Sequence, residues 1–348
     1  MISDNMPVVN VAAVQAAPVF LDRDATISKL DDLTAQAARG GADLVVFGES
    51  FLPGFPIWGG VLAPIDQHDL NRRLYDNSIE VPGPHTEQLG RIAARNSVVL
   101  SVGVTERSDT SVGQMFNTNL IFDSTGKLVN HRRKLVATWH ERLTWSHGDA
   151  FNLEPVELNG WRLGALICGE NTNTLARFSM LAQGERLHIA TFPPAWSFDS
   201  RTQGGTDFDM SSAIAIRTIA HSYEGKVFSV VAASTLDEDA VAQVTQGDAE
   251  MAARLRGMPG RSMIVNPRGQ IVAGPLVGEE GILHAAVDLS EEILEKTLHD
   301  ITGTYNRFDI FNLRIDKTRH PALTITENSV SHSDRSDFEL GEAVTNVN

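Results

Sequence analysis

Strand-length runs of apolar residues alternate with helical patterns in both halves of this 348-residue chain, and this alternation restricts its fold more than any other feature. In the first half, a predicted strand over Val8–Gln15 precedes a helix that Asp24 is expected to cap, and a buried strand over 44–47 follows. In the second half, a strand over Trp161–Ile167 precedes a predicted helix over 172–183. Such units cover a largely parallel sheet with helices, so the pattern predicts an α/β fold.

The pattern continues without a low-complexity linker, so residues 1–300 are predicted to form a single domain. No regular element is predicted between residue 233, where a strand ends, and residue 262, where a hairpin begins. Beyond residue 300 the periodicity is lost, although segment 301–328 keeps apolar side chains, and we interpret it as an oligomerisation extension. The last segment, 329–348, is polar and acidic, which is typical of a disordered tail.

The composition argues against several classes of protein. A formal net charge of −15 argues against general binding of nucleic acid. No apolar run approaches the roughly 20 residues that span a membrane, and no signal peptide is expected, so we predict a cytoplasmic protein. The one cysteine permits neither an internal disulfide nor a cysteine-based metal cluster.

That cysteine, Cys168, ends the strand 161–167 and is followed by Gly169, which permits a sharp reversal of the chain. A lone cysteine after an apolar run is most often a small buried residue. The alternative is a nucleophile, because a strand-to-helix corner exposes its side chain beside the backbone N–H groups of the next helix. The local sequence leaves both interpretations open.

Two further charged residues follow predicted strands. Glu49 comes after the buried strand 44–47, and Lys134 comes after a hairpin strand, at the end of the basic run Arg132-Arg133-Lys134. Taken singly, Glu49 is more simply a loop cap and Lys134 one more solvated cation. Because ligand sites of α/β folds lie where strands end, the three residues could also meet at one edge.

The segments around these residues resemble the nitrilase branch of the carbon–nitrogen hydrolases. The matching segments, in one-letter code, are FGESFLPG (47–54), RRKL (132–135), HERLTWSHGD (140–149), CGEN (168–171) and RSMIVNPRG (261–269). The matches run from about residue 8 to residue 313, in the order and spacing of the family. No single segment would be specific, but the ordered set is.

The resemblance implies an α-β-β-α sandwich that pairs into an α-β-β-α-α-β-β-α arrangement in a homodimer, which spiral contacts sometimes extend. It implies Glu49 as general base, Lys134 as the cation beside the reacting centre and Cys168 as nucleophile, with Glu141 as a second glutamate in the pocket. The corresponding reaction converts a nitrile into a carboxylic acid and ammonia through a covalent thioimidate and then a thioester. No metal and no cofactor are implied.

The expected pocket is aromatic. An aromatic wall favours arylaliphatic or medium-length aliphatic nitriles over acetonitrile and charged substrates. The residues that we expect to bind the substrate are Phe55, Trp58, Trp139, Trp145, Gly169, Asn171 and Phe192. Two positions depart from the family pattern, since Gly169 replaces a common tryptophan and Thr304 replaces a frequent histidine.

The sequence can also be interpreted in terms of other functions. An amidase or carbamoylase, or a relative that stops at the amide, would use the same three residues. A catalytically silent scaffold would be expected to lack one of them, and all are present. The segment 140–144 resembles the zinc-protease helix motif but has Thr144 in place of the second histidine, so it is rejected.

Overall fold

The computed structural model describes residues 6–158, 160–196, 208–257 and 259–319, and its helices and strands all lie in the unit Met1–Thr318. Two six-stranded sheets form the centre of this unit. The first sheet has the order β12 (Gly281–Asp288), β1 (Val8–Gln15), β2 (Leu44–Val46), β3 (Val99–Arg107), β4 (Met115–Phe122) and β5 (Leu128–Arg133). The second has the order β11 (Ile271–Val277), β10 (Arg261–Val265), β9 (Phe228–Ala233), β8 (Leu187–Phe192), β7 (Trp161–Ile167) and β6 (Val156–Leu158).

The central strands are apolar on both faces, because each sheet is covered on both sides. In β1, Val11 and Ala13 pack into a core shared with the second sheet, whereas Ala12 and Val14 pack into the core beneath the helices. Alternate residues of a strand point to opposite faces, so one apolar run serves both layers. Parallel pairing accompanies this burial, of β1 with β2 and β2 with β3 in the first sheet, and of β7 with β8 and β8 with β9 in the second.

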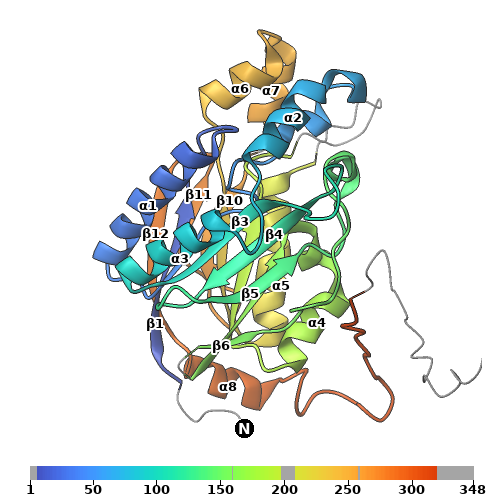
Figure 1. The fold of residues 1–348 in the computed structure, drawn as a ribbon. Coiled ribbons are helices and arrows are strands. Elements are labelled where there is room, and N and C mark those ends of the chain that lie inside the picture. Colours follow the sequence, from blue (N-terminus) through green and yellow to red (C-terminus); the bar gives the residue numbers. More distant parts are fainter. Residues whose placement is uncertain (1–5, 159, 197–207, 258, 320–348) are drawn as a thin grey trace, which may run out of the picture. The chain divides into compact units, whose positions relative to one another are not determined.

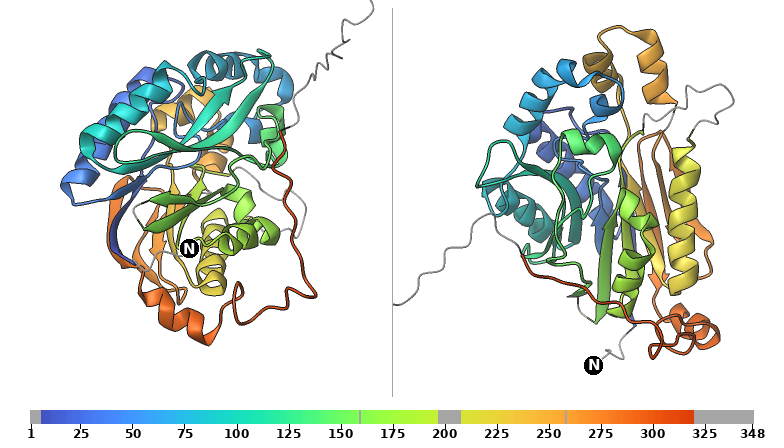
Figure 2. Two further views of the ribbon diagram at one scale, coloured as in Figure 1. Left: turned by 60° about the horizontal axis from the view of Figure 1, so that its bottom comes forward. Right: turned by 90° about the vertical axis from the view of Figure 1, so that its right-hand side faces the viewer.

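Helices cover the outer face of each sheet, as the right-hand view of Figure 2 shows. Ile27 of α1 (Arg23–Arg39) and Leu89 of α3 (Pro84–Asn96) pack on the first sheet, and Met180 of α4 (Thr174–Ala182) and Ile214 of α5 (Met210–Gly225) pack on the second. The predicted α-β-β-α sandwich is therefore confirmed (Figure 1). The remaining helices are α2 (His68–Asn77), α6 (Glu238–Thr245), α7 (Ala249–Arg256) and α8 (Glu291–Leu298), with 3-10 turns η1 (Ile57–Gly60), η2 (Pro64–Asp66), η3 (Trp139–Leu143) and η4 (Cys168–Thr172).

Some predicted boundaries were wrong. Asp22, not Asp24, caps α1, and its carboxylate accepts from the Ala25 N–H at 3.0 Å. The helix after Cys168 begins only at Thr174, because the chain first forms η4 and then uses the Asn173 side chain as the cap. Helices α6 and α7 were not predicted at all, since each has only eight residues.

The predicted tail 329–348 and Asn159, between β6 and β7, lie outside the described residues. Strands β6 and β7, on either side of Asn159, pair antiparallel. Over the described part of the chain, no helix has both the length and the apolar character needed to cross a membrane.

Candidate active site

Glu49, Lys134 and Cys168 each follow a strand, and the ends of these strands bring the three side chains close together. Glu49 lies three residues after β2, Lys134 directly follows β5, and Cys168 directly follows β7. The Glu49 N–H donates to the carbonyl of Phe192 at the end of β8, at 3.1 Å, so this segment of the first sheet is bonded to the second sheet. Glycine at position 103 makes the approach possible, because a β-carbon there would lie only 2.4–2.5 Å from the backbone atoms before and after Glu49.

A buried ion cluster results. The Lys134 ammonium donates to Oε1 of Glu49 at 2.7 Å and to both oxygens of Glu141 at 2.9 and 2.7 Å. The Asn117 amide donates to the same Oε1 of Glu49 at 2.7 Å. Oε2 of Glu49 is buried and accepts no hydrogen bond from the residues that the structure describes. A carboxylate oxygen of each glutamate and the sulfur of Cys168 lie within 4.8 Å of one another.

The cluster contains two carboxylates for one ammonium, and this shifts two pKa values. Burial alone would lower the pKa of Lys134, but the carboxylates of Glu141 and Glu49 outweigh it and raise that pKa. Burial raises the pKa of Glu141 to about 7, with Lys134 opposing and Glu49 adding to the effect. Lysine thus stays charged, and Glu141 exchanges its proton near neutral pH.

Cys168 is held in an unusual conformation at the start of η4. Its φ angle of 48° lies in the left-handed region, which non-glycine residues rarely adopt and which is found at strained functional turns. The Asn171 amide fixes the corner by donating to the carbonyls of Cys168 at 3.1 Å and Leu166 at 3.2 Å. Burial raises the pKa of the Cys168 thiol, and Glu49 raises it further while Lys134 opposes. The thiol therefore rests uncharged and needs a base to become a nucleophile.

A second buried ion pair joins the segment that carries Lys134 to the segment that carries Cys168. Arg132 of β5 and Glu170 of η4 are bonded through both carboxylate oxygens. The same oxygens accept from the N–H groups of Leu135 and Ile167, each at 2.7 Å. Glu170 thereby connects the chain around Lys134 with the strand that ends at Cys168.

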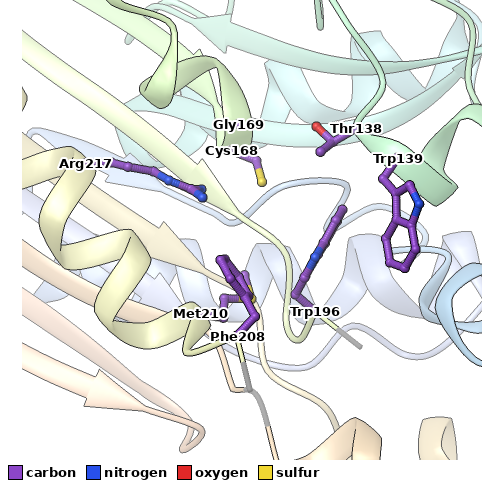
Figure 3. Close-up of a pocket in the computed structure, with 8 residues that line it drawn as sticks. All are labelled: Thr138, Trp139, Cys168, Gly169, Trp196, Phe208, Met210 and Arg217. Atoms are coloured by element: carbon purple, nitrogen blue, oxygen red, sulfur yellow. The ribbon is translucent and has the colours of Figure 1, made fainter. Parts of the chain in front are cut away.

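The Cys168 sulfur faces a pocket of about 290 Å³ (Figure 3). This volume is near the lower end of the roughly 300–1,000 Å³ that is typical of small-ligand sites. Gly169 contributes to the space, because even a β-carbon at this position would lie 3.0 Å from the Thr138 hydroxyl. The pocket is lined by Thr138, Trp139, Cys168, Gly169, Trp196, Phe208, Met210 and Arg217.

The chain is similar in sequence to known proteins over most of its length. The sequence model of the carbon–nitrogen hydrolase family matches residues 10–293. The chain belongs to this family. A nitrilase from Paraburkholderia phymatum is 34% identical over 324 residues, which cover 93% of this chain and 91% of the relative. An arylacetonitrilase from Aspergillus kawachii is 32% identical over 314 residues, covering 88% and 92%.

The same fold occurs in a solved structure. The carbon–nitrogen hydrolase from Helicobacter pylori superposes with a TM-score of 0.66 over 84% of this chain and 93% of the other. Sequence identity to that protein is 18%, so the likeness concerns the fold alone.

In this carbon–nitrogen hydrolase, the residues expected to bind substrate lie in several places. Trp139, 53% exposed, and Gly169 line the pocket. Phe55 lies behind that lining, against Trp196 and against the buried Trp145, with ring centroids 6.5 and 5.4 Å away.

The other three lie away from the lining. Trp58 is buried, and its indole N–H donates to Asn71 at 3.0 Å. Asn171 supports the corner at Cys168, and Phe192 is a core residue at the end of β8. Asn171, Phe192 and Trp58 therefore pack in the interior and not on the surface of the pocket.

Sequence reasoning missed other residues of the site. Asn117 on β4 bonds Glu49, and the only available sign was an amide amid the apolar residues of a strand. Arg217 and Met210 reach the pocket from α5, more than 40 residues after Cys168. The sign at Arg217 was a cation three residues after Ile214, on the helix face that also carries Met210.

Proposed function

We propose that this enzyme hydrolyses organic nitriles, arylaliphatic or of medium aliphatic length, to carboxylic acids and ammonia. The proposal depends above all on one observation, that a carboxylate oxygen of Glu49 lies within 4.8 Å of the Cys168 sulfur in a buried, lysine-containing cluster, while Oε2 of Glu49 accepts no hydrogen bond from the described residues. The apolar pocket above the sulfur suits a substrate with an apolar body. Relatives named nitrilase, at 32–34% identity over nearly the full length, support the reaction type.

The first half of the reaction forms the covalent intermediate. Oε2 of Glu49 takes the thiol proton of Cys168, and the sulfur attacks the nitrile carbon. Negative charge that develops on the nitrile nitrogen is stabilised by the Lys134 ammonium, and the nitrogen takes up a proton to give a thioimidate. The buried, low-dielectric cluster strengthens this stabilisation, because no bulk water screens the charges.

The second half releases both products. Glu49 takes a proton from a water molecule, which adds to the thioimidate carbon, and ammonia leaves to give a thioester. A second water, activated in the same way, releases the acid and restores the thiol. Glu141, whose pKa is raised to about 7, is suited to position the water and to share its proton. The Gly169 N–H supplies a donor to the oxyanion at the chain reversal.

The reaction is tested with purified enzyme on arylaliphatic, medium-length aliphatic and small nitriles, each beside its matching amide. We expect ammonia from the nitriles, with acid as the main product. Release of ammonia from the amides alone would assign an amidase, and accumulation of amide without ammonia would assign a hydratase. Cys168→Ala, which keeps a small apolar side chain at the corner, is the control for enzyme-dependent release.

The enzyme is also proposed to work as a homo-oligomer. Phe308, Ile310 and Phe311 follow the last helix and are 52%, 61% and 67% exposed. Together with Phe178 of α4 they border a groove of about 490 Å³. Apolar surface of this kind is commonly covered by a partner. Light scattering should give a multiple of 37.9 kDa, and a monomer at working concentration would contradict the proposal.

A further inference from the structure

A single cation lies in the wall of the pocket. Of the eight residues that line it, only Arg217 carries a formal charge, and the others are mainly apolar or aromatic. Figure 3 shows the Arg217 side chain extending from its helix with the guanidinium turned toward the space in front of the Cys168 sulfur. Its side chain is partly exposed, so it is neither a core residue nor a fully solvated one.

The position of Arg217 on α5 explains why its side chain points toward the pocket. Arg217 follows Met210 by seven residues and Ile214 by three, so the three side chains share one face of α5. Met210 lines the pocket and Ile214 is fully buried beneath it. Neighbours on the opposite face, Ile216 and Tyr223, are 69% and 54% exposed. A cation at position 217 is therefore presented to the pocket rather than to bulk solvent.

Among the described residues, no acidic side chain neutralises the guanidinium of Arg217. Within the described ranges, Arg217 forms no hydrogen bond and no ion pair, whereas Lys134 is bonded to two carboxylates. An arginine presents its N–H groups as a planar fork that matches the two oxygens of a carboxylate. In a protein with a net charge of −15, this cation is a local exception that can attract an anionic group.

We propose that Arg217 binds a carboxylate on the substrate, so that the preferred substrates are nitriles bearing a carboxylate at the far end of an apolar body. This inference rests on the proposed nitrile hydrolysis and specifies its substrate class. The nitrile lies at the sulfur of Cys168, the body against Trp196 and Met210, and the carboxylate on Arg217. It reverses the sequence-based expectation that charged substrates are disfavoured, because that expectation was based on an aromatic wall and did not include Arg217.

The test uses ω-cyanoalkanoates of stepwise increasing length, each beside its methyl ester, with initial rates of ammonia release as readout. The ester keeps the shape of the chain end but removes the charge. For the wild type, kcat/KM should favour the carboxylate at the length that spans the sulfur and the guanidinium. In Arg217→Gln, kcat/KM should fall about ten- to a hundredfold for the carboxylates, which is typical for loss of a charge-assisted hydrogen bond, and change little for the esters.

Two further variants serve as controls. Arg217→Lys keeps the charge but loses the fork, so it should retain an intermediate preference. Arg72→Gln makes the same change of net charge on the exposed face of α2, where the arginine pairs with Asp76. It should change kcat/KM for neither the carboxylates nor the esters. Ester turnover close to that of the wild type shows that Arg217→Gln is folded.

An equal loss for carboxylates and esters in Arg217→Gln would overturn the inference, because it would show that Arg217 supports Cys168 or the fold. A wild type that favours the esters at every length would overturn it as well, while leaving nitrile hydrolysis intact. Absence of ammonia from nitriles of both series would instead contradict the proposed function, and the inference would fall with it.

Discussion

Two of the buried ion clusters of this enzyme, one around Arg132 and one around Lys134, are neighbours in sequence but differ in their balance of charge. Arg132 and Lys134 are two residues apart, and their partners Glu170 and Glu141 are both fully enclosed. The Arg132–Glu170 pair has one charge of each sign, and each carboxylate oxygen accepts two hydrogen bonds. The Lys134 cluster has two carboxylates for one cation and an oxygen of Glu49 without a donor among the described residues.

The difference indicates which buried charges are available for chemistry. A neutral pair whose carboxylate oxygens each accept two hydrogen bonds costs free energy to disrupt, and its carboxylate is poorly placed to take up a proton. An unbalanced cluster with an unused acceptor can take a proton from a nearby thiol with little rearrangement. We therefore propose that Arg132 and Glu170 hold the segments of the site in place, and that Glu49 and Lys134 provide proton transfer and charge stabilisation. Four experiments test this assignment, in order of expected effect.

The largest effect is expected at the sulfur beside the unbalanced cluster. Cys168→Ala should abolish turnover and leave the fold intact, because alanine fills most of the same small space. Cys168→Ser should be nearly inactive too, since a hydroxyl is a much poorer nucleophile near neutral pH. Ammonia release and circular dichroism measure the two properties. A serine variant with a rate near wild type would contradict covalent catalysis by the thiol.

Lys134→Ala and Glu49→Gln should each lower kcat on the order of a thousandfold or more, because each removes charge stabilisation or proton transfer in the transition state. Direct ammonia assays on the best nitrile measure the loss. Full activity in either variant would mean that the base or the cation is another residue. Arg133→Gln, which removes the neighbouring cation bonded to Glu106 instead, is the matched control and should keep most of the activity.

Glu170→Gln should act mainly on stability. It leaves Arg132 buried without a counter-charge, and breaking a buried pair in this way typically costs about 3–5 kcal/mol. Denaturant unfolding at fixed protein concentration measures this loss, and kcat per folded molecule should fall far less than in Lys134→Ala. A thousandfold loss of kcat at unchanged stability would remove the distinction between the two clusters.

The smallest effect is a difference in pH dependence. Burial raises the pKa of Glu141 to about 7 from 4.5, so its contribution to stability is full below pH 4.5 and is lost as pH rises through 7. Burial also opposes ionisation of Glu170, but Arg132 and the backbone N–H groups outweigh it and lower that pKa, so its contribution is present above pH 4.5 and is lost as pH falls.

Between pH 4.5 and 7, the unfolding free energy of the wild type should therefore fall, as pH rises, relative to that of Glu141→Gln, because the amide does not titrate. The change should not exceed about 3 kcal/mol, given about 1.4 kcal/mol for each pKa unit. Glu170→Gln should instead differ from the wild type most at neutral pH and least in acid. Parallel pH profiles for the wild type and Glu141→Gln would show that Glu141 does not titrate in this range.

The sequence predicted the sandwich because its strands are long apolar runs and its family segments are ordered. It also brought Glu49, Lys134 and Cys168 together as a hypothesis, since each follows a strand. The residues that line the pocket were harder to predict from the sequence, because aromatic residues near these positions in sequence, such as Trp58, point into the core. Its actual wall includes α5, whose Arg217 lies 49 residues beyond Cys168 and is brought back by the packing of the second sheet.

The pairing of β1 with β12 has a consequence for how the enzyme is made. Val8 pairs with Asp288 and Gln15 with Gly281, so the first strand of the domain is joined to the last. At a typical ribosomal rate of about 5–20 residues per second, β1 waits roughly a quarter of a minute to a minute for that partner. Until then one edge of β1 is open to pairing with other chains, which is a known route to aggregation. We expect its yield in cells to depend on chaperones during synthesis.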